Sequence, residues 1–406
     1  MRFSNRTQWN LTPNELTRRV ALLRERGRTL LDLTESNPTR CDFQYPQAII
    51  DAISQPQSLS YNPTPQGLRS AREAVAEHYA RHDASIDPDH LILTASTSEA
   101  YSFLFRLLAE PGDQILVPQP SYPLFDFLAQ LNDVELQPYP LEYDSVWLID
   151  WRSLEQACTP KTRGIILVNP NNPTGSGLSP RERDRLIPFC RDRELPIICD
   201  EVFVDFGFGR SSKDASSKSP DGSRELHSLV GETGTLTFVL NGISKMMGLP
   251  QMKLAWVATS GPQEWLTAAL ERLEVIADTY LSVSTPVQVA LPKLLSDVQP
   301  MIQSQILDRI RANLGILDEC VSKTGGLCRR LAADGGWSAI ISIPRSYSEE
   351  EWVLRWLEQD HVLVHPGYFF DFHKTGYAVL SLLPHPDVFR EAVQRLVARV
   401  QSEMKG

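Results

Sequence analysis

The chain has 406 residues, 42% of them hydrophobic, which is enough to bury a large core and to form more than one domain. Its 50 acidic and 40 basic residues give a formal net charge of -10 without a basic stripe, which argues against a nucleic-acid partner. Its apolar runs are shorter than the roughly 20 residues that cross a bilayer. Its six cysteines are widely spaced, and its eight histidines form no metal-binding pattern. We therefore expect a cytoplasmic protein with no membrane partner and no metal site.

The first predicted element is a helix over residues 12–27. Thr12 occupies the place of an N-cap, Pro13 suits the first helical position, and Glu15 completes a capping box. Gly27 follows the last apolar residue and predicts the end of the helix. The arginine-rich N-terminus is therefore interpreted as an ordinary helix and not as a transit peptide.

Short apolar runs follow, with helical stretches between them. Each is apolar on both faces, as the strands of a buried parallel sheet are. The runs lie at residues 91–94, 114–117, 164–168, 196–200, 236–240 and 254–259. They predict an α/β domain. Residues 211–223 are rich in Ser, Lys and Asp and predict an exposed, mobile loop insertion.

Polar turns follow several of these runs. The turns are TASTSEA, PQPSYP, NPNNPTG, DEVF and NGISK. Open α/β sheets bind ligands beyond the carboxyl ends of their strands, so we expect the chemistry in these turns. Asp200 closes the run PIICD, and Lys245 follows the run LTFVL. A solvated strand-end residue is the alternative for each, but a carboxylate buried after four apolar residues must be paired.

The character of the sequence changes near residue 296. Predicted helices there span residues 298–323, 348–359 and 386–404. They alternate with the short runs GWSAIISIP, HVLVHP and YAVLSLL. We expect residues 1–45 and 296–406 to form a smaller α+β domain, and residues 46–295 to form the large domain.

Three motifs in this order resemble those of the fold-type I aminotransferases of class I and II. They are NPNNPTG (169–175), PIICDEVF (196–203) and GISKMMGLPQMKL (242–254). The resemblance extends over nearly the whole chain and implies the cofactor pyridoxal 5'-phosphate (PLP). It also implies a large α/β domain with a mostly parallel seven-stranded sheet covered by helices, and a smaller α+β domain. The implied reaction is a ping-pong transfer of an amino group from an amino donor to a keto acid or another carbonyl acceptor.

The resemblance assigns the catalytic roles to Lys245 and Asp200. Lys245 matches the lysine that forms a Schiff base with PLP and carries a proton in the reaction, for which its amine must be neutral. Burial lowers the pKa of a lysine and so favours that form. Asp200 matches the aspartate that keeps the pyridine nitrogen protonated, so that the ring accepts electrons.

Further residues match the family's cofactor contacts. Asn172 would donate a hydrogen bond to the 3'-oxygen of the ring, and Tyr122 would stack on the ring face. Ser96, Thr97 and Ser98 follow a strand and open a helix, where free amides and the helix dipole favour the phosphate. A turn asparagine, a packing tyrosine and a plain N-cap serine are the structural alternatives.

Ser244 and Lys253 would complete the phosphate site from the opposite side. Tyr61, in YNPTPQG, matches the tyrosine that reaches the phosphate of the neighbouring subunit. The resemblance therefore implies a homodimer with shared active sites.

Four positions depart from the family pattern. Phe203 stands where a tyrosine usually binds the 3'-oxygen, and Gly242 stands where a serine is usual. Lys253 replaces the phosphate arginine and offers a point charge in place of a fork. Val379, in GYAVLSLLP, replaces the arginine that usually grips the α-carboxylate of the substrate.

Without an arginine at position 379, the substrate carboxylate needs another partner. Arg40, in ESNPTR, is the best candidate, and we place Asn37 and Asn172 with it in the substrate site. A surface loop residue is the alternative for Arg40. Otherwise the natural substrate is not an ordinary α-amino acid.

Two other functions are compatible with parts of this pattern. Another fold-type I PLP enzyme, such as a lyase, decarboxylase or synthase acting on an amino acid or amine, would share the lysine, the aspartate and the phosphate site. A PLP-binding transcription regulator would carry a basic DNA-binding domain in front, but only about 30 residues precede the family's first segment. The identity of the substrate lies outside what the sequence predicts.

Overall fold

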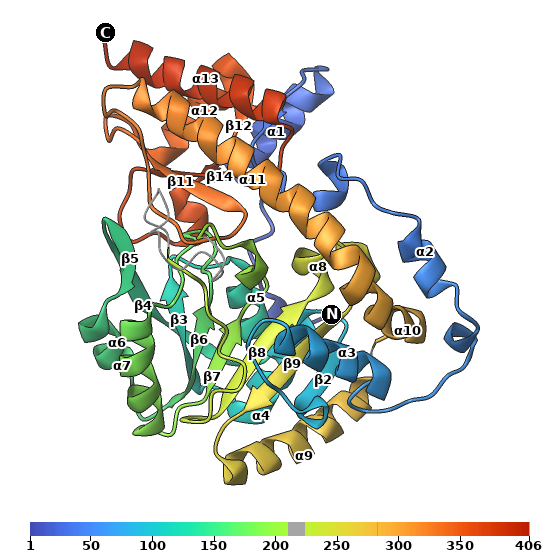
Figure 1. Cartoon of the computed structure of the whole chain (residues 1–406). Coiled ribbons are helices and arrows are strands. Elements are labelled where there is room, and N and C mark those ends of the chain that lie inside the picture. The colour runs from blue at the N-terminus through green and yellow to red at the C-terminus, as the bar shows by residue number, and fades with distance from the viewer. Residues whose placement is uncertain (210–223, 282, 406) are drawn as a thin grey trace.

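The computed structural model describes residues 1–209, 224–281 and 283–405, so the loop insertion predicted at 211–223 lies outside the described residues. Its largest feature is an eight-stranded sheet with the strand order β2-β9-β8-β7-β6-β3-β4-β5 (Figure 1). The strands are β2 (Leu91–Thr94), β3 (Gln114–Gln119), β4 (Glu135–Asp144), β5 (Val146–Ile149), β6 (Thr162–Val168), β7 (Ile197–Asp200), β8 (Thr237–Gly242) and β9 (Ala255–Ser260). The neighbours from β8 through β7, β6 and β3 to β4 pair parallel, whereas β9 and β5 pair antiparallel with their neighbours.

The six apolar runs of the sequence are confirmed as strands, but the sheet has eight strands and not the expected seven. The strands without a predicted counterpart are β4 and β5. β4 contains Pro138 and Pro140, and Tyr139 is the one residue of this strand that is fully buried. β5 has four residues and pairs with β4 at the edge of the sheet. A strand near an edge is partly solvated, so it lacks the continuous apolar pattern of a central parallel strand.

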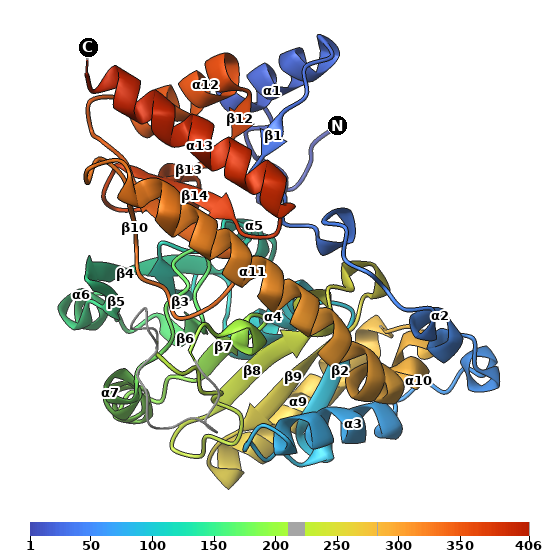
Figure 2. The same cartoon turned by 45° about the horizontal axis from the view of Figure 1, so that its top comes forward.

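Helices cover both faces of this sheet (Figures 1 and 2). Ile198 belongs to the apolar cluster under the helices of one face, and Ile197 belongs to the cluster of the other face. Successive strand residues point to opposite faces, which is why the central strands are apolar at every position. The first face carries α4 (Thr97–Leu108), α5 (Leu124–Leu131) and α9 (Gln263–Tyr280). The second carries α3 (Arg69–Ala80), α6 (Trp151–Ala157) and α7 (Pro180–Arg191). α10 (Thr285–Lys293) packs on α3, and α2 (Ala48–Ile53) packs on α10 (Figure 1).

A smaller domain is built on a four-stranded antiparallel sheet in the order β10-β11-β14-β13. Its strands are β10 (Arg329–Arg330), β11 (Ser338–Ser342), β14 (Tyr377–Ser381) and β13 (His365–Pro366). β1 pairs parallel with β12 and so joins the N-terminal segment to this domain. These strands and the helices around them are β1 (Leu31–Asp32), β12 (Val362–Leu363), α1 (Glu15–Glu25), α11 (Gln299–Ser322), α12 (Glu349–Asp360) and α13 (Pro386–Glu403). Figure 2 shows α11 running from the large domain to the smaller one. The domain limits at residues 45 and 296 stay a prediction.

The predicted helices of the C-terminal part are confirmed as α11, α12 and α13. The N-terminal helix is shorter than predicted, because its N-cap is Asn14 and not Thr12. Asn14 Oδ1 accepts a hydrogen bond of 2.8 Å from the amide of Thr17. Asparagine is a stronger N-cap residue than threonine, which agrees with the cap at Asn14. Over the described ranges, no helix has the length and apolarity that a membrane span needs.

Candidate active site

The turns singled out in the sequence gather at one edge of the large sheet. β3, β6, β7 and β8 are parallel neighbours, so their carboxyl ends lie together. The chain order reverses between β3 and β6, because β4 and β5 lie on one side of this pair and β7 and β8 lie on the other. Such a switch point is where open α/β sheets bind their ligands.

Lys245 lies in the short helix α8 (Ile243–Met246), directly after β8. Its Nζ is 5.7 Å from the centre of the Phe203 ring and 5.1 Å from the centre of the Trp337 ring. Burial lowers the pKa of Lys245, although the negative charge of Asp200 acts in the opposite direction. The amine therefore has a larger neutral fraction than an exposed lysine, as a nucleophile requires.

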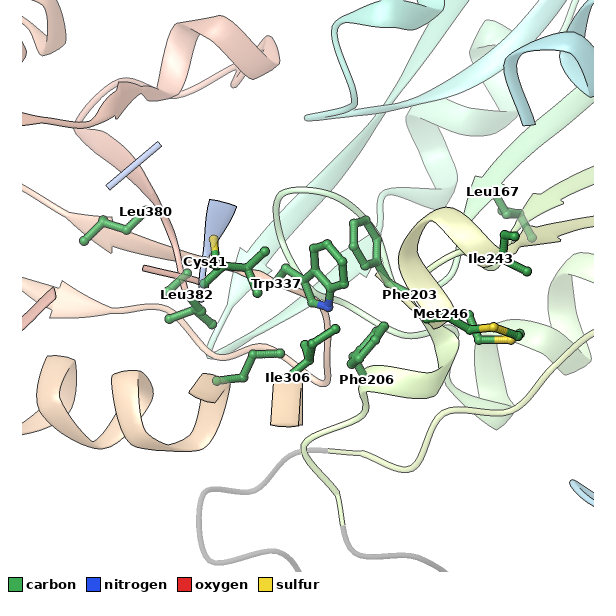
Figure 3. Packing of buried hydrophobic residues seen from close by; sticks show 14 of the residues in the cluster. Cys41, Leu167, Phe203, Phe206, Ile243, Met246, Ile306, Trp337, Leu380 and Leu382 are labelled. Atoms are coloured by element: carbon green, nitrogen blue, oxygen red, sulfur yellow. The ribbon is translucent and has the colours of Figure 1, made fainter. Parts of the chain in front are cut away.

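Trp337 belongs to the smaller domain and directly precedes β11. It is 3% exposed, and its ring packs edge-on against Phe203 and Phe206 with centroid distances of 5.4 and 5.1 Å. Figure 3 shows it between these two rings on one side and Cys41 and Leu382 on the other. Both domains therefore build the aromatic wall beside the lysine. Our sequence reasoning missed Trp337, and the available signal was a large aromatic residue directly before an apolar run.

Asp200 ends β7 and is 8% exposed. Tyr101 Oη donates a hydrogen bond of 3.1 Å to its Oδ2, and the amide of Val202 donates one of 3.2 Å to its Oδ1. Burial nevertheless raises the pKa of Asp200 to about 6. The carboxylate is thus still largely ionised at neutral pH and supplies a buried negative charge. Tyr101 is a second residue that the sequence reasoning missed, and its signal was one tyrosine on the buried apolar face of α4.

The predicted phosphate site lies at the start of α4. Ser96 is the N-cap, and its Oγ accepts a hydrogen bond of 3.1 Å from the amide of Glu99. The amides of Thr97 and Ser98 lie in the first turn, where a helix offers no acceptor of its own. The helix dipole favours an anion at this end. The capping role of Ser96 and a phosphate site are therefore compatible.

Asn172 and Tyr122 lie on segments that are bonded to each other. Asn171 Nδ2 donates a hydrogen bond of 3.2 Å to the carbonyl oxygen of Pro120, which ties the turn after β6 to the turn after β3. Asn172 is half-buried, and Tyr122 is 45% exposed. Burial and the charge of Asp200 both raise the pKa of Tyr122, so the tyrosine hydroxyl lies within the electrostatic field of that carboxylate.

Ser244 and Lys253 lie on the other side of the lysine. Ser244 is half-buried in α8, whereas Lys253 is exposed and has a φ of 54°. The packing explains why Gly242 stands in the place of a serine. A Cβ on Gly242 would lie 2.7 Å from the Cβ of Ala255 and 2.9 Å from the carbonyl oxygen of Leu254. The close approach of β9 to β8 therefore excludes a side chain at this position.

Arg40 and Asn37 lie on the segment between β1 and α2. The Arg40 side chain is 74% exposed, and its ion pair with Glu35 spans 4.0 Å. Asn37 caps the 3-10 turn that carries Arg40. Tyr45 Oη donates a hydrogen bond of 2.7 Å to the carbonyl oxygen of Gly248, which brings this segment next to the loop after α8. The structure thus places Arg40 near the lysine loop but on the surface.

Tyr61 and Val379 have opposite surroundings. Tyr61 is 72% exposed, and among the described residues no hydrogen bond joins it to the groups around the lysine. Val379 is 2% exposed and packs in an apolar cluster with Trp147, Leu331 and Ile340. A carboxylate buried among these side chains would lose its hydration without gaining a partner. Position 379 is therefore closed to a substrate carboxylate.

Comparison with known proteins decides the family. The family model for aminotransferase class I and II matches residues 28–396. The chain belongs to the class I and II aminotransferases. It is 25% identical over 395 residues to the glutamate-pyruvate aminotransferase AlaA of Haemophilus influenzae, covering 94% of this chain and 93% of that one. It is 27% identical over 391 residues to the alanine aminotransferase of Mycobacterium bovis, with coverages of 93% and 87%.

Solved structures support the same fold. The alanine aminotransferase from Pyrococcus furiosus matches this aminotransferase with a TM-score of 0.87 at 23% identity, covering 99% of this chain and 100% of that one. The aspartate aminotransferase from Thermus thermophilus matches with a TM-score of 0.79 at 21% identity, with coverages of 98% and 100%. The predicted fold class and the predicted aminotransferase function are thereby confirmed.

Aminotransferases of this class use PLP, and the residues of this aminotransferase fit that cofactor. Lys245, with its lowered pKa, suits the aldehyde carbon, and the buried carboxylate of Asp200 suits the pyridine nitrogen. The first turn of α4 suits the phosphate. β2 pairs antiparallel with β9, and β9 pairs antiparallel with β8, so β2 runs in the same direction as β7 and β8. The three groups that follow these strands therefore lie at the same edge of the sheet.

Proposed function

We propose that Lys245 and Asp200 are the catalytic residues, and that the amino group moves between an α-amino acid and a 2-oxo acid in a ping-pong cycle. The observation that carries this proposal is the amine of Lys245, whose pKa burial lowers, next to the rings of Phe203 and Trp337 and in the field of the buried Asp200 carboxylate. The names of the relatives, alanine and glutamate-pyruvate aminotransferases, support the substrate class.

The chain's own residues divide the work around the cofactor. When bound, PLP supplies a conjugated ring that takes up the electron pair of the bond broken at the substrate α-carbon. Lys245 would hold the aldehyde carbon, and its freed Nζ would carry the proton of the substrate α-carbon. Asp200 holds the proton on the ring nitrogen, and Tyr101 orients that carboxylate. Phe203 and Trp337 keep water away from the amine.

The remaining cofactor contacts follow from the same placement. Asn172 would donate a hydrogen bond to the 3'-oxygen, and Tyr122 would stack on the ring. The amides at the start of α4, with the hydroxyls of Ser96, Thr97 and Ser98, hold the phosphate. Ser244 and Lys253 approach the phosphate from the other side.

Arg40 is the proposed partner of the substrate α-carboxylate. Its guanidinium is exposed, its pairing with Glu35 is loose at 4.0 Å, and its segment adjoins the loop after the lysine helix. A bidentate arginine is the strongest partner for a carboxylate. Asn37 caps the turn that carries Arg40, and we place it beside the same substrate group.

The second candidate is transfer from a primary amine that has no α-carboxylate. The apolar surroundings of Val379 favour this alternative, because they offer no charge where the family usually places its arginine.

The assembly and the compartment are also part of the proposal. We place Tyr61 at the phosphate of a partner subunit in a homodimer, which agrees with its exposure of 72% in the single chain. The widely spaced cysteines fit a reducing cytoplasm.

Two experiments test the proposal. Borohydride reduction followed by peptide mapping should attach the cofactor to Lys245, and a label on any other lysine would contradict the proposal. The purified enzyme should then be mixed with single amino acids and amines, and the loss of its visible absorption recorded.

Arg40→Ala tests the proposed partner of the substrate carboxylate. Arg311→Ala is its control, because it removes another exposed arginine. Loss of a carboxylate partner should raise the amino-acid concentration for half-saturation at least about 10-fold in Arg40→Ala only. If both variants reach half-saturation at the same amino-acid concentration, Arg40 is not the partner of the substrate carboxylate. Reaction with amines but not with amino acids would favour the second candidate.

A further inference from the structure

Asp334 lies in the smaller domain, on the loop that leads from β10 to Trp337. It is 5% exposed, so its carboxylate is stable only if it is paired. Oδ2 accepts hydrogen bonds of 2.8 Å from the amide of Gly177 and of 2.8 and 3.0 Å from the guanidinium of Arg224. Oδ1 accepts a hydrogen bond of 2.8 Å from the amide of Arg224. One carboxylate of the smaller domain thus binds two segments of the large domain.

The backbone around Asp334 is bonded to the same segments. The amides of Asp334 and Gly335 both donate to the carbonyl oxygen of Gly175, across 2.7 and 3.0 Å. The amide of Phe208 donates to the carbonyl oxygen of Asp334 across 2.7 Å, and Gly207 and Gly335 form an isolated bridge. A Cβ on Gly175, whose φ is 67°, would overlap the carbonyl oxygen of Gly335. The three backbones are therefore in direct contact.

These three segments adjoin residues of the candidate active site. Asn172 lies three residues before Gly175 in the turn after β6. Phe206 directly precedes Gly207, and Trp337 lies two residues after Gly335. Any movement of the Asp334 loop would therefore move the ring of Trp337 relative to the turn that bears Asn172.

We infer that Asp334 is a positioning residue of this aminotransferase, which holds the Asn172 turn and the Trp337 ring in one rigid arrangement around Lys245. The inference rests on the proposed function, which gives Lys245 and Asn172 their roles. Asp334 acts through these residues and does not itself touch the cofactor or the substrate. Its effect would be large, because a misplacement of about 1 Å at a reacting group lowers a rate by roughly 10²-fold.

The test compares Asp334→Ala with Glu349→Ala in the holoenzyme. Glu349 is also 5% exposed and also lies in the smaller domain. Its carboxylate accepts hydrogen bonds of 2.8, 2.8 and 2.9 Å from the amides of Tyr368, Gly376 and Tyr377. Both substitutions remove a buried carboxylate that holds backbone amides, so both should lower Tm. Only Asp334 is bonded to the turn that bears Asn172.

Two readouts separate positioning from stability. Asp334→Ala should lower kcat about 30-fold or more and move the pH midpoint of the visible absorption of the lysine-linked cofactor, whereas Glu349→Ala should change neither appreciably. Asp334→Asn keeps an acceptor for the Gly177 amide and should restore part of kcat. If Asp334→Ala and Glu349→Ala agree in both readouts, Asp334 has only a structural role and the inference is wrong.

A second variant covers the case in which Asp334→Ala does not fold. Arg224→Gln removes the charged partner of the carboxylate but leaves the backbone bonds to Gly175 in place. It should shift the same absorption midpoint in the same direction by a smaller amount. An unchanged midpoint would overturn the inference.

The wild-type spectrum distinguishes failure of the proposed function from failure of the inference about Asp334. If the wild type lacks the absorption band, or if Lys245→Ala retains it, the proposed function is wrong. If the band is present, is lost in Lys245→Ala and is unmoved by Asp334→Ala, only the inference about Asp334 is wrong.

Discussion

Tyr101 Oη donates a hydrogen bond to Asp200 Oδ2 across 3.1 Å, in a region where both residues are buried. Burial raises the pKa of Asp200, and the bonds from the Val202 amide and from Tyr101 lower it. These opposing effects leave the carboxyl with a pKa of about 6, close enough to neutrality for one hydrogen bond to matter. Tyr101 therefore helps to decide how much of the carboxylate is ionised at physiological pH.

Tyr101→Phe should raise the pKa of Asp200 further and shift the acidic limb of the kcat/KM profile to higher pH. A hydrogen bond to a charged group contributes about 1.5–3 kcal/mol, so we expect a loss of about 10-fold or more in kcat/KM near neutral pH. The control is Tyr139→Phe, because Tyr139 is 1% exposed and donates a hydrogen bond of 2.8 Å to a backbone carbonyl. An acidic limb that stays in place in Tyr101→Phe would contradict this prediction.

Asp200 should also affect the pH dependence of folding in the cofactor-free protein. Its folded pKa is raised from 3.8 to about 6, so the folded state binds the proton more tightly than the unfolded chain does. The resulting stabilisation is complete below about pH 4 and is lost as the pH rises through about 6. Asparagine cannot ionise, so the unfolding free energy of Asp200→Asn should rise relative to that of the wild type by about 3 kcal/mol as the pH increases from about 4 to above 6.

Urea unfolding of the cofactor-free proteins at several pH values measures this difference. Asp308→Asn serves as the control, because the Asp308 side chain is 73% exposed. If the difference in unfolding free energy between Asp200→Asn and the wild type does not change with pH, burial does not raise the pKa of this carboxyl and the prediction is wrong.

Phe203→Tyr should restore a hydroxyl where the family usually has one. Stabilisation of the deprotonated 3'-oxygen by that hydroxyl should lower the pH midpoint of the cofactor's visible absorption. Phe203 is 8% exposed against Trp337, so Phe203→Leu is the control that removes the ring without adding a donor. If Phe203→Tyr leaves the pH midpoint of the absorption unchanged, the missing hydroxyl at position 203 does not affect the cofactor and the prediction is wrong.

Gly242→Ser should destabilise the protein although its backbone is extended there, with a φ of 176° that any residue adopts. The cause is steric, because the new Cβ would lie 2.7 Å from the Cβ of Ala255. Such overpacking typically costs about 1–3 kcal/mol. Ala255→Gly should relieve part of the cost, and a double-mutant cycle measured by thermal unfolding gives the coupling. Strictly additive effects would mean that Ala255 is not the obstacle.

Local information was sufficient for much of the fold. The helix predicted over residues 348–359 is confirmed as α12, and a capping box of Ser348 and Glu351 starts it. The apolar run before Asp200 predicted a strand whose end is buried. By contrast, the predicted N-cap Thr12 was wrong, because Asn14, a stronger N-cap residue than threonine, caps α1.

The sequence by itself determined the parallel core of this aminotransferase and the placement of Lys245 and Asp200 after its strands, because strand patterns and motif order are properties of neighbouring residues. Only the tertiary structure decided which partners these two residues meet. Tyr101 is 99 residues from Asp200 along the chain, and Trp337 reaches the lysine from the other domain. The sequence showed that position 379 is a valine, but the burial of this side chain against Trp147 and Ile340 depends on how the two domains pack. Contacts between distant segments follow from the packing of whole elements, which no local pattern encodes.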